Sequence, residues 1–204
     1  PDALERFVEP LEKNPHYGFS YSSFYYASTN PENHKIGEII RVSDMPDIKT
    51  RGFLIPLLEW NFLGGAALFA RSSCYDKVGN FDEELFRSQD YDMANRISEE
   101  FEGVMAKGGP TLYYRQHAGL RGNLADRFEV EKQKKKWFYY GSIHFKKRYK
   151  NMPLERYLPP GKDVEKYKRQ AILQRCAVMA YRHLFDEVFM DLNLFAELHD
   201  VSPL

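Results

Sequence analysis

Apolar and polar positions alternate along the chain with two periodicities, one typical of helices and one typical of strands. Apolar residues recur at helical spacing between Leu4 and Leu11, and Pro15 marks the end of the helix that this spacing predicts. The run at 17–27 is rich in aromatic residues and serine, is poor in helix formers, and favours a strand. The turn residues that follow, at 28–51, indicate a long connection.

Glycine and serine residues divide the middle of the chain into short predicted elements. In chain order these are a strand at 38–42, a buried strand at 66–70, a short helix that ends at Val78, a helix that begins after Ser88, and strands at 104–107 and 111–116. The chain is then basic and helical from 127 to 150, and a last long helix is expected near 164–189. This order predicts an α/β domain with a helical tail.

Composition narrows the protein class. The 204 residues carry 29 basic and 29 acidic side chains, so the formal net charge of zero gives no electrostatic support for a nucleic-acid-coating protein. The hydrophobic share of 43% argues against disorder. The two cysteines have no metal-type spacing, which argues against a disulfide framework or a zinc site. No apolar run approaches the ~20 residues of a membrane helix.

The charges are nevertheless segregated, with acids at 82–102 and bases at 132–150. The basic segment also contains aromatic residues, and such a surface can contact anionic lipid headgroups, nucleic acid or a phosphate-bearing acceptor. The ordinary alternative is a solvated helix face. Because the net charge is zero, we expect that the protein binds no nucleic acid. We expect a cytoplasmic protein, and peripheral membrane contact through 132–150 stays open. The final helix is expected to be a packing or dimer element, which leaves a homo-oligomer open.

The most informative residues run from Gly64 to His117. They contain GGAALFARSSCYDKVGNFDEEL, then SQDYDMANRISEE, then YYRQH. This order resembles the second half of a family 2 glycosyltransferase with the GT-A fold: a small-residue strand, an Arg and a helix, a Gly-Phe-Asp-Glu turn, an acidic motif that opens a helix, and an Arg-x-His pair on a strand. The chain departs from that pattern at Asn80, where glycine is commoner, and at Gln89, where glutamate is usual.

The resemblance implies a partial GT-A fold, an α/β mixed sheet with flanking helices. Residues 1–125 would form the acceptor-side half of the transferase domain, and residues 126–204 a helical C-terminal extension. In the family, an Asp-x-Asp motif that binds metal and sugar nucleotide comes shortly before the segment that resembles Pro1 and its neighbours. The resemblance thus implies a longer enzyme that includes the nucleotide-binding part, and a present chain that is inactive alone.

The implied activity is transfer of a sugar, with inversion, from a nucleotide-sugar donor to a saccharide or glycoconjugate acceptor in polysaccharide biosynthesis. A non-catalytic module that binds carbohydrate or protein and derives from such an enzyme is the alternative function. An Asp-x-Asp motif upstream of Pro1 would favour the enzyme over this module.

Asp90 is the candidate general base. It lies two residues after Ser88, near the predicted helix start, where the helix dipole favours an ionised carboxylate. Such a carboxylate can take the proton of an acceptor hydroxyl. The ordinary alternative is a helix-start acid that only interacts with the dipole, and the resemblance favours the base. Asp92 is expected to be solvated or paired with Arg96, four residues on.

Arg115 and His117 are two residues apart on a predicted strand and so share a face. The resemblance implies that His117 completes a Mn²⁺ or Mg²⁺ site with the Asp-x-Asp carboxylates, and an imidazole ligand favours Mn²⁺. Arg115 could hold diphosphate oxygens as a planar fork. The alternatives are a hydrogen-bonded histidine at a strand end and an arginine in an ordinary ion pair.

A further group of residues is predicted to line the acceptor pocket. Aromatic rings stack on the apolar faces of sugars, and glycines let a ligand approach the backbone closely. The candidates of this kind are Trp60, Asn61, Gly64 and Gly65, and Asp82 could contact the acceptor. The alternatives are a core tryptophan beside a turn and an aspartate that shapes the turn.

Overall fold

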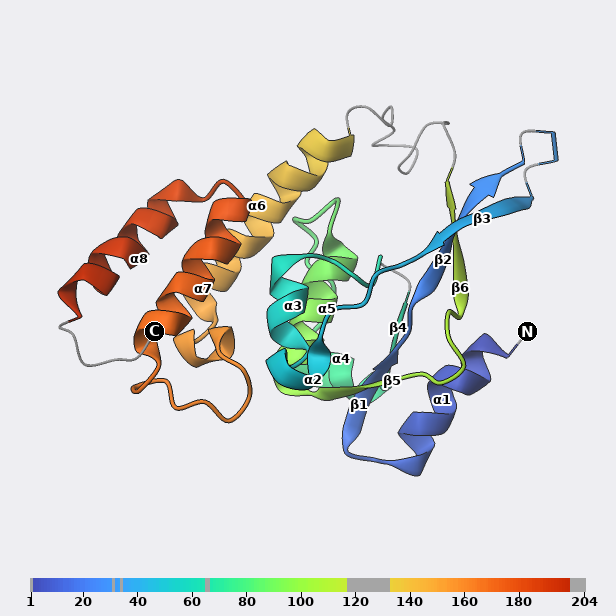
Figure 1. Ribbon diagram of the computed structural model, residues 1–204, viewed down its shortest axis with the longest axis horizontal. Coiled ribbons are helices and arrows are strands. Elements are labelled where there is room, and N and C mark those ends of the chain that lie inside the picture. The colour runs from blue at the N-terminus through green and yellow to red at the C-terminus, as the bar shows by residue number, and fades with distance from the viewer. Residues whose placement is uncertain (1, 31, 34, 65–66, 117–132, 199–204) are drawn as a thin grey trace. The chain divides into compact units, whose positions relative to one another are not determined.

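The computed structural model describes residues 2–30, 32–33, 35–64, 67–116 and 133–198 (Figure 1). The chain divides into two compact units, each assembled from separate stretches. The first unit contains Pro1–Pro46, Asn61–Phe81 and Arg96–Lys134, and the second contains Asp47–Trp60, Asp82–Asn95 and Lys135–Leu204. The mixture of strands and helices confirms the predicted α/β class.

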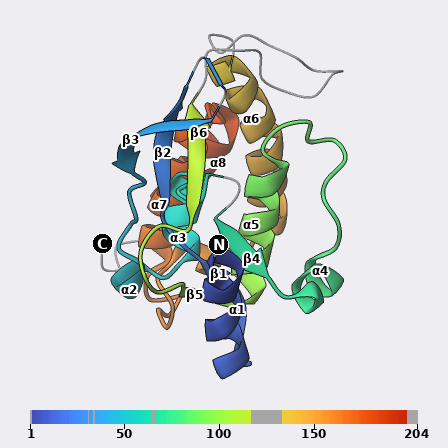
Figure 2. The same cartoon turned by 90° about the vertical axis from the view of Figure 1, so that its right-hand side faces the viewer.

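Two three-stranded mixed sheets form the first unit, each with one parallel and one antiparallel pair (Figure 2). In the first sheet β1 (Tyr17–Tyr21) lies between β4 (Leu68–Ala70), which is antiparallel to it, and β5 (Glu102–Met105), which is parallel. In the second sheet β2 (Phe24–Thr29) lies between antiparallel β3 (Ile36–Val42) and parallel β6 (Leu112–Gln116). The predicted strands at 38–42, 66–70, 104–107 and 111–116 thus correspond to β3, β4, β5 and β6, with shifted ends.

The single strand predicted at 17–27 is in fact two strands that belong to different sheets. The chain changes sheets at Ser22 and Ser23, both of which are buried. Ser22 donates its amide to the carbonyl of Ala67 (3.0 Å), and the carbonyl of Ser23 accepts from the amide of Thr111 (3.2 Å). These long-range hydrogen bonds satisfy the backbone at the break, so no glycine or proline is needed to mark it.

Helix α1 (Ala3–Lys13) covers the first sheet with its apolar face. Phe7 and Leu11 are buried, and the Ser20 hydroxyl of β1 donates to the Phe7 carbonyl (2.7 Å). The sheet itself requires a glycine, because a Cβ on Gly103 would lie 2.2 Å from the ring of the fully buried Phe19. The short helix α4 (Ser72–Val78) ends where predicted, with Gly79 at φ 81° as its C-cap.

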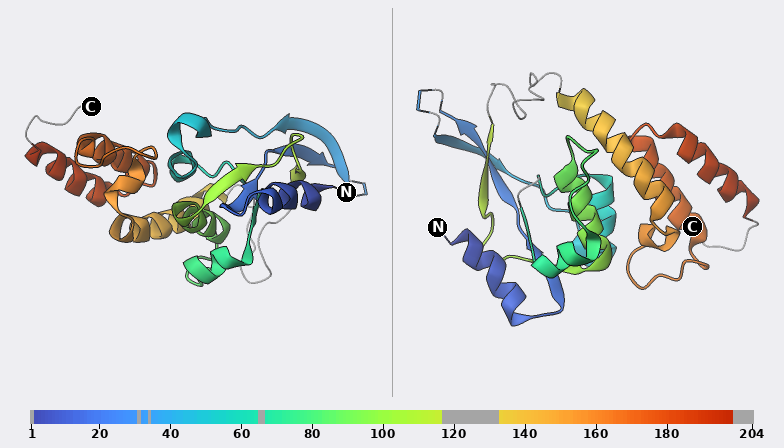
Figure 3. Two further views of the ribbon diagram at one scale, coloured as in Figure 1. Left: turned by 90° about the horizontal axis from the view of Figure 1, so that it is seen from below. Right: turned by 180° about the vertical axis from the view of Figure 1, so that it is seen from behind.

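Helices dominate the second unit (Figure 3). They are α2 (Ile48–Arg51), α3 (Leu54–Glu59), α6 (Gln133–Asn151), the 3-10 helix η2 (Leu154–Tyr157), α7 (Lys168–Tyr181) and α8 (Phe185–Glu197). Helix α7 packs against α8, η2 and α3. Helix α5 (Gln89–Glu100) begins in this unit and ends in the first one. Within the described part of the chain, no helix combines the length and the apolar character needed to cross a membrane.

The last long helix and α3 differ from the sequence-based expectation, as does the short α2 within the connection predicted at 28–51. The last long helix predicted at 164–189 is broken after Tyr181, because Arg182 turns into the protein and His183 adopts a left-handed φ of 58°. Helix α3 was not predicted, and its residues Ile55 to Leu58 are buried, so apolar burial rather than an amphipathic pattern defines it.

Candidate functional site

Asp90 lies in the first turn of α5, where the sequence predicts it. The residue before this helix, Ser88, has a left-handed φ of 63°, and its carbonyl accepts the amide of Asp92 (2.8 Å) to close the first turn. A left-handed conformation is unfavourable for a residue with a side chain and costs about 1–3 kcal/mol. The backbone therefore enters α5 through a sharp, strained turn immediately before Asp90.

The electrostatic state of Asp90 differs from the expectation based on the helix dipole. Burial raises the pKa of the Asp90 carboxyl above its ordinary value, although hydrogen bonds from the backbone amides of Tyr91 and Asp90 act in the opposite direction. The loss of hydration therefore raises the pKa of Asp90 by more than the backbone amides at the start of the helix lower it. A carboxylate with a raised pKa holds a proton more strongly, which is the property that a general base requires.

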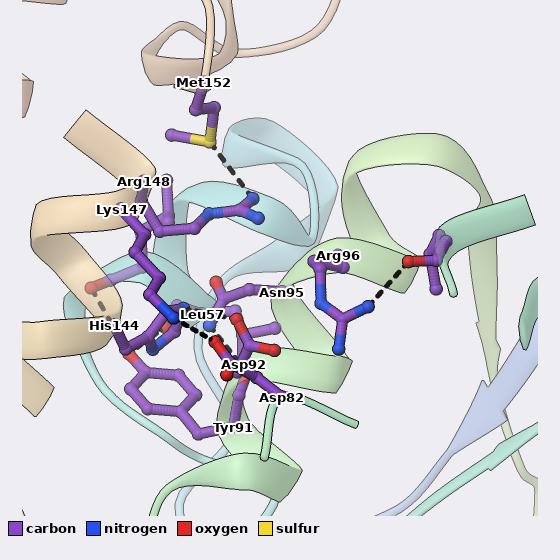
Figure 4. A network of polar contacts seen from close by, with 12 residues as sticks. Leu57, Asp82, Tyr91, Asp92, Asn95, Arg96, His144, Lys147, Arg148 and Met152 are labelled. Carbon is purple, nitrogen blue, oxygen red and sulfur yellow. Dashed lines mark hydrogen bonds and ion pairs between the residues drawn. The ribbon is translucent and has the colours of Figure 1, made fainter. Parts of the chain in front are cut away.

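The side chain next to Asp90 anchors this turn within the second unit. Tyr91 is buried, and its hydroxyl donates to the carbonyl of Leu57 in α3 (Figure 4). The same hydroxyl accepts from Nη2 of Arg182 at 2.9 Å. Burial is the main cause that raises the pKa of the Tyr91 phenol, so the hydroxyl keeps its proton and its donor role. The start of α5 is thus tied both to α3 and to the residue that follows α7.

Arg182 is the centre of this arrangement. Its Nη2 also donates to the carbonyls of Leu58 (2.9 Å) and Glu59 (3.1 Å), which are among the last carbonyls of α3 and have no partner inside the helix. The guanidinium lies 4.1 Å above the ring centroid of Phe145 and 4.6 Å above that of Tyr181. One buried cation therefore joins the end of α3, the start of α5 and the middle of α6.

Asp92 is buried, so the expectation of a solvated side chain is wrong. Only 6% of the residue is exposed, and its Oδ1 lies 3.4 Å from Nε2 of the fully buried His144 on α6. Figure 4 shows this pair beside Tyr91. Arg96, the partner predicted for Asp92, donates to the carbonyls of Val78 (2.6 Å) and Asn80 (2.9 Å).

Asp82 lies in an ion pair with α6. The Lys147 ammonium is 2.6 Å from a carboxylate oxygen of Asp82 and 2.6 Å from one of Glu84. The hydrogen bonds to Asp82 and Glu84 raise the pKa of Lys147 above its ordinary value. Asp82 thus helps to fix the turn before α5, and its predicted contact with an acceptor stays a prediction.

The predicted acceptor-pocket residues belong to both units. Trp60 is 39% exposed and ends α3 in the second unit, so it is not a core tryptophan. In the first unit, Asn61 buries a side-chain oxygen that has no hydrogen-bond partner within the described part of the chain. Gly64 has a φ of 58° and packs against the ring of Phe24, while Gly65 lies outside the described residues.

The predicted donor-side residues belong to the first unit. Arg115 is exposed on β6 and pairs in register with Ala27 of β2. His117 lies outside the described residues. Because Asp90 belongs to the second unit, its convergence with Arg115 on one site stays a prediction of the resemblance.

The implied metal has no set of ligands in the part of the chain that the structure describes. No three His, Cys, Asp or Glu side chains gather there in an arrangement that could hold a metal ion. The described residues therefore do not fit the ion by themselves, and the Mn²⁺ or Mg²⁺ site stays a prediction that depends on His117 and on carboxylates from elsewhere.

The partners of Asp90's turn were missed by sequence reasoning. Arg182 and His144 lie within the helices predicted at 164–189 and 127–150, and periodicity alone does not show that distant segments bury them.

Comparisons with protein-family models, with curated proteins and with solved structures found no match for this chain.

Proposed function

We propose that this chain is the acceptor-side part of a nucleotide-sugar-dependent glycosyltransferase, with Asp90 as the general base. The observation that best supports the proposal is the setting of Asp90: it is partly buried in the first turn of α5, its pKa is raised, and a strained Ser88 precedes it. Raised carboxyl pKa values and strained backbone both concentrate at functional sites.

In the proposed reaction, an acceptor hydroxyl attacks the anomeric carbon of the donor sugar. The bond between the acceptor oxygen and that carbon forms while the bond from the carbon to the diphosphate oxygen breaks, and the electron pair leaves with the diphosphate. The acceptor proton passes to the Asp90 carboxylate. Attack on the face opposite the leaving group inverts the anomeric centre.

A general base needs a fixed position as well as a suitable pKa, because a small displacement weakens proton transfer. The hydroxyl of Tyr91 provides this restraint through its hydrogen bonds to Leu57 and Arg182. The exposed ring of Trp60 offers an apolar face on which an acceptor sugar can stack, which suits the same proposal.

The test uses the full-length gene product, and an Asp-x-Asp motif upstream of Pro1 in it would favour the transferase over a binding module. Nucleoside diphosphate release is measured for a panel of nucleotide sugars, with and without saccharide acceptors. Asp90→Asn removes the base but keeps the side-chain size, so we expect kcat to fall by about 10²–10⁴-fold. The dissociation constant of the donor should change little.

Asp76→Asn is the matched control, because Asp76 is an exposed carboxylate on α4. This variant should transfer sugar at the wild-type rate. Full transfer by Asp90→Asn would refute the role of Asp90. Saccharide binding without any transfer by the wild type would instead identify a non-catalytic binding module.

A further inference from the structure

Helix α8 has an inverted polarity for a surface helix. Its acidic residues Glu187 and Asp191 are 7% and 1% exposed, whereas Phe185, Phe189 and Met190 are 54%, 64% and 61% exposed. Helices that lie on a protein surface ordinarily bury their apolar stripe and expose their charged residues. The apolar stripe of α8 therefore has no covering element within the described second unit.

One buried and one partly exposed ion pair fix this orientation. The Asp191 carboxylate accepts hydrogen bonds from Nε of Arg175 at 2.8 Å and from the hydroxyl of Tyr149 at 3.1 Å. Glu187 lies 3.5 Å from the ammonium of Lys146. Rotation of α8 to bury its phenylalanines would leave Arg175, whose side chain is 12% exposed, without its carboxylate partner, which is strongly unfavourable. The exposed stripe is thus held outward by the packing of α6 and α7.

The stripe has the spacing of a helix-pairing seam. Phe185, Phe189, Leu192 and Ala196 follow one another at intervals of four, three and four residues, and all four are exposed. This alternation is the one that lets two helices pack side by side with interlocking side chains.

Aromatic residues extend the same surface beyond α8. The ring of His183 stacks on Phe185 (centroids 6.0 Å apart) and on Phe138 of α6 (4.9 Å), and Phe138 contacts Tyr181 (6.3 Å). We call this surface the apolar band. Its members are Phe138, Tyr181, His183, Phe185, Phe189, Met190, Leu192 and Ala196.

The area of the apolar band matches what a dimer needs. With about 200 Å² for a fully exposed large side chain, the exposed fractions of its large apolar members correspond to about 600 Å². A standard interface buries about 800 Å² on each partner, of which about 65% is apolar in homodimers, or roughly 500 Å². One copy of the band therefore supplies the apolar part of a complete interface.

We propose that the apolar band binds a second copy of this chain, with α8 paired to α8 of the other copy about a two-fold axis. A two-fold interface joins the same patch on both copies, so a single seam suffices. The exposed Asp186 beside Phe185 makes an anionic lipid surface a poorer occupant of α8. This inference is independent of the proposed function.

Sedimentation equilibrium of the 204-residue chain over a range of concentrations tests the proposal. We expect the wild type to have twice the mass of one chain at high concentration. Phe189→Asp should raise the dimer dissociation constant by at least about 30-fold, because the buried centre of an interface carries most of its energy. Phe81→Asp is the control, since Phe81 is 51% exposed in the first unit, and it should dimerise like the wild type.

Circular dichroism checks that Phe189→Asp is folded, and amide hydrogen exchange of the wild type gives a readout that needs no variant. Exchange in α8 should slow as the protein concentration rises. A wild type that is monomeric at every concentration, or an α8 whose exchange ignores concentration, overturns the proposal. So does a monomer that cosediments with phosphatidylserine vesicles, which would identify a lipid surface as the occupant.

Discussion

Arg182 should contribute more to stability than any surface residue of the second unit. It is 6% exposed and donates to Leu58, Glu59 and Tyr91, and its guanidinium also stacks on Phe145. Arg182→Ala removes all of these contacts at once. It also leaves the Glu59 carbonyl without this donor, leaves the Leu58 carbonyl with only the Tyr91 hydroxyl at 3.3 Å, and creates a cavity above the Phe145 ring.

The magnitude follows from these contacts. A hydrogen bond from a charged donor contributes about 1.5–3 kcal/mol, and a buried neutral acceptor that loses its donor costs about 1–3 kcal/mol, so the loss of several such contacts amounts to roughly 3–5 kcal/mol. For a chain of this length, each kcal/mol lowers Tm by about 2–4 °C. We therefore expect Arg182→Ala to lower Tm by about 10 °C. Arg182→Lys should recover only a small part, because an ammonium cannot make the planar fork or the stacking contact.

Thermal unfolding followed by circular dichroism measures the effect, with Arg156→Ala as the matched control because Arg156 is exposed within η2. The control should unfold within about 2 °C of the wild type, as surface substitutions ordinarily do. If Arg182→Ala matched that control, or if Arg182→Lys were fully stable, Arg182 would not be the centre that joins α3, α5 and α6.

Two further predictions concern the candidate site. Gly64→Ala should lower the free energy of unfolding in urea by about 1–3 kcal/mol, because φ is 58° and the new Cβ would lie 2.6 Å from the Phe24 ring. The control Gly141→Ala, in open space on α6, should raise it by about 0.5–1 kcal/mol. Equal effects would refute the tight packing of Gly64. Because burial raises the pKa of Asp90 above 3.8, the folded state holds the proton more tightly than the unfolded chain, so ionised Asp90 destabilises the fold above that pKa. Asp90→Asn should therefore raise Tm at neutral pH. The gain should shrink as pH falls through the raised pKa of Asp90 and vanish below the ordinary value of 3.8. A Tm difference that did not change with pH would contradict the pKa shift.

Elements set by local signals were predicted well. The helix that ends at Val78 is terminated by Gly79, and α5 begins directly after Ser88, because a turn or cap residue acts on its immediate neighbours. For the same reason the location of Asp90 in a first helical turn could be predicted. The α/β class follows from the alternation of such elements.

Features set by distant contacts could not be predicted. The break between α7 and α8 has no glycine or proline, and it occurs where Arg182 reaches Tyr91, which is 91 residues away in sequence. The partners of Asp92 and the buried side of α8 depend in the same way on packing between helices. Periodicity reports that a helix has two faces, and tertiary contacts decide which face is buried.

The second unit is assembled from three stretches of the chain that are synthesised at different times. Helix α3 and the first turn of α5 leave the ribosome before residues 135–204, which contain their partners Arg182 and Phe145. These early segments must wait, with Leu57, Leu58 and Tyr91 exposed, until the last helices emerge. A product that stopped near residue 125 would keep Asp90 in its sequence and lose the contacts that hold its turn. The C-terminal helices are thus required for maturation of the segment that carries Asp90.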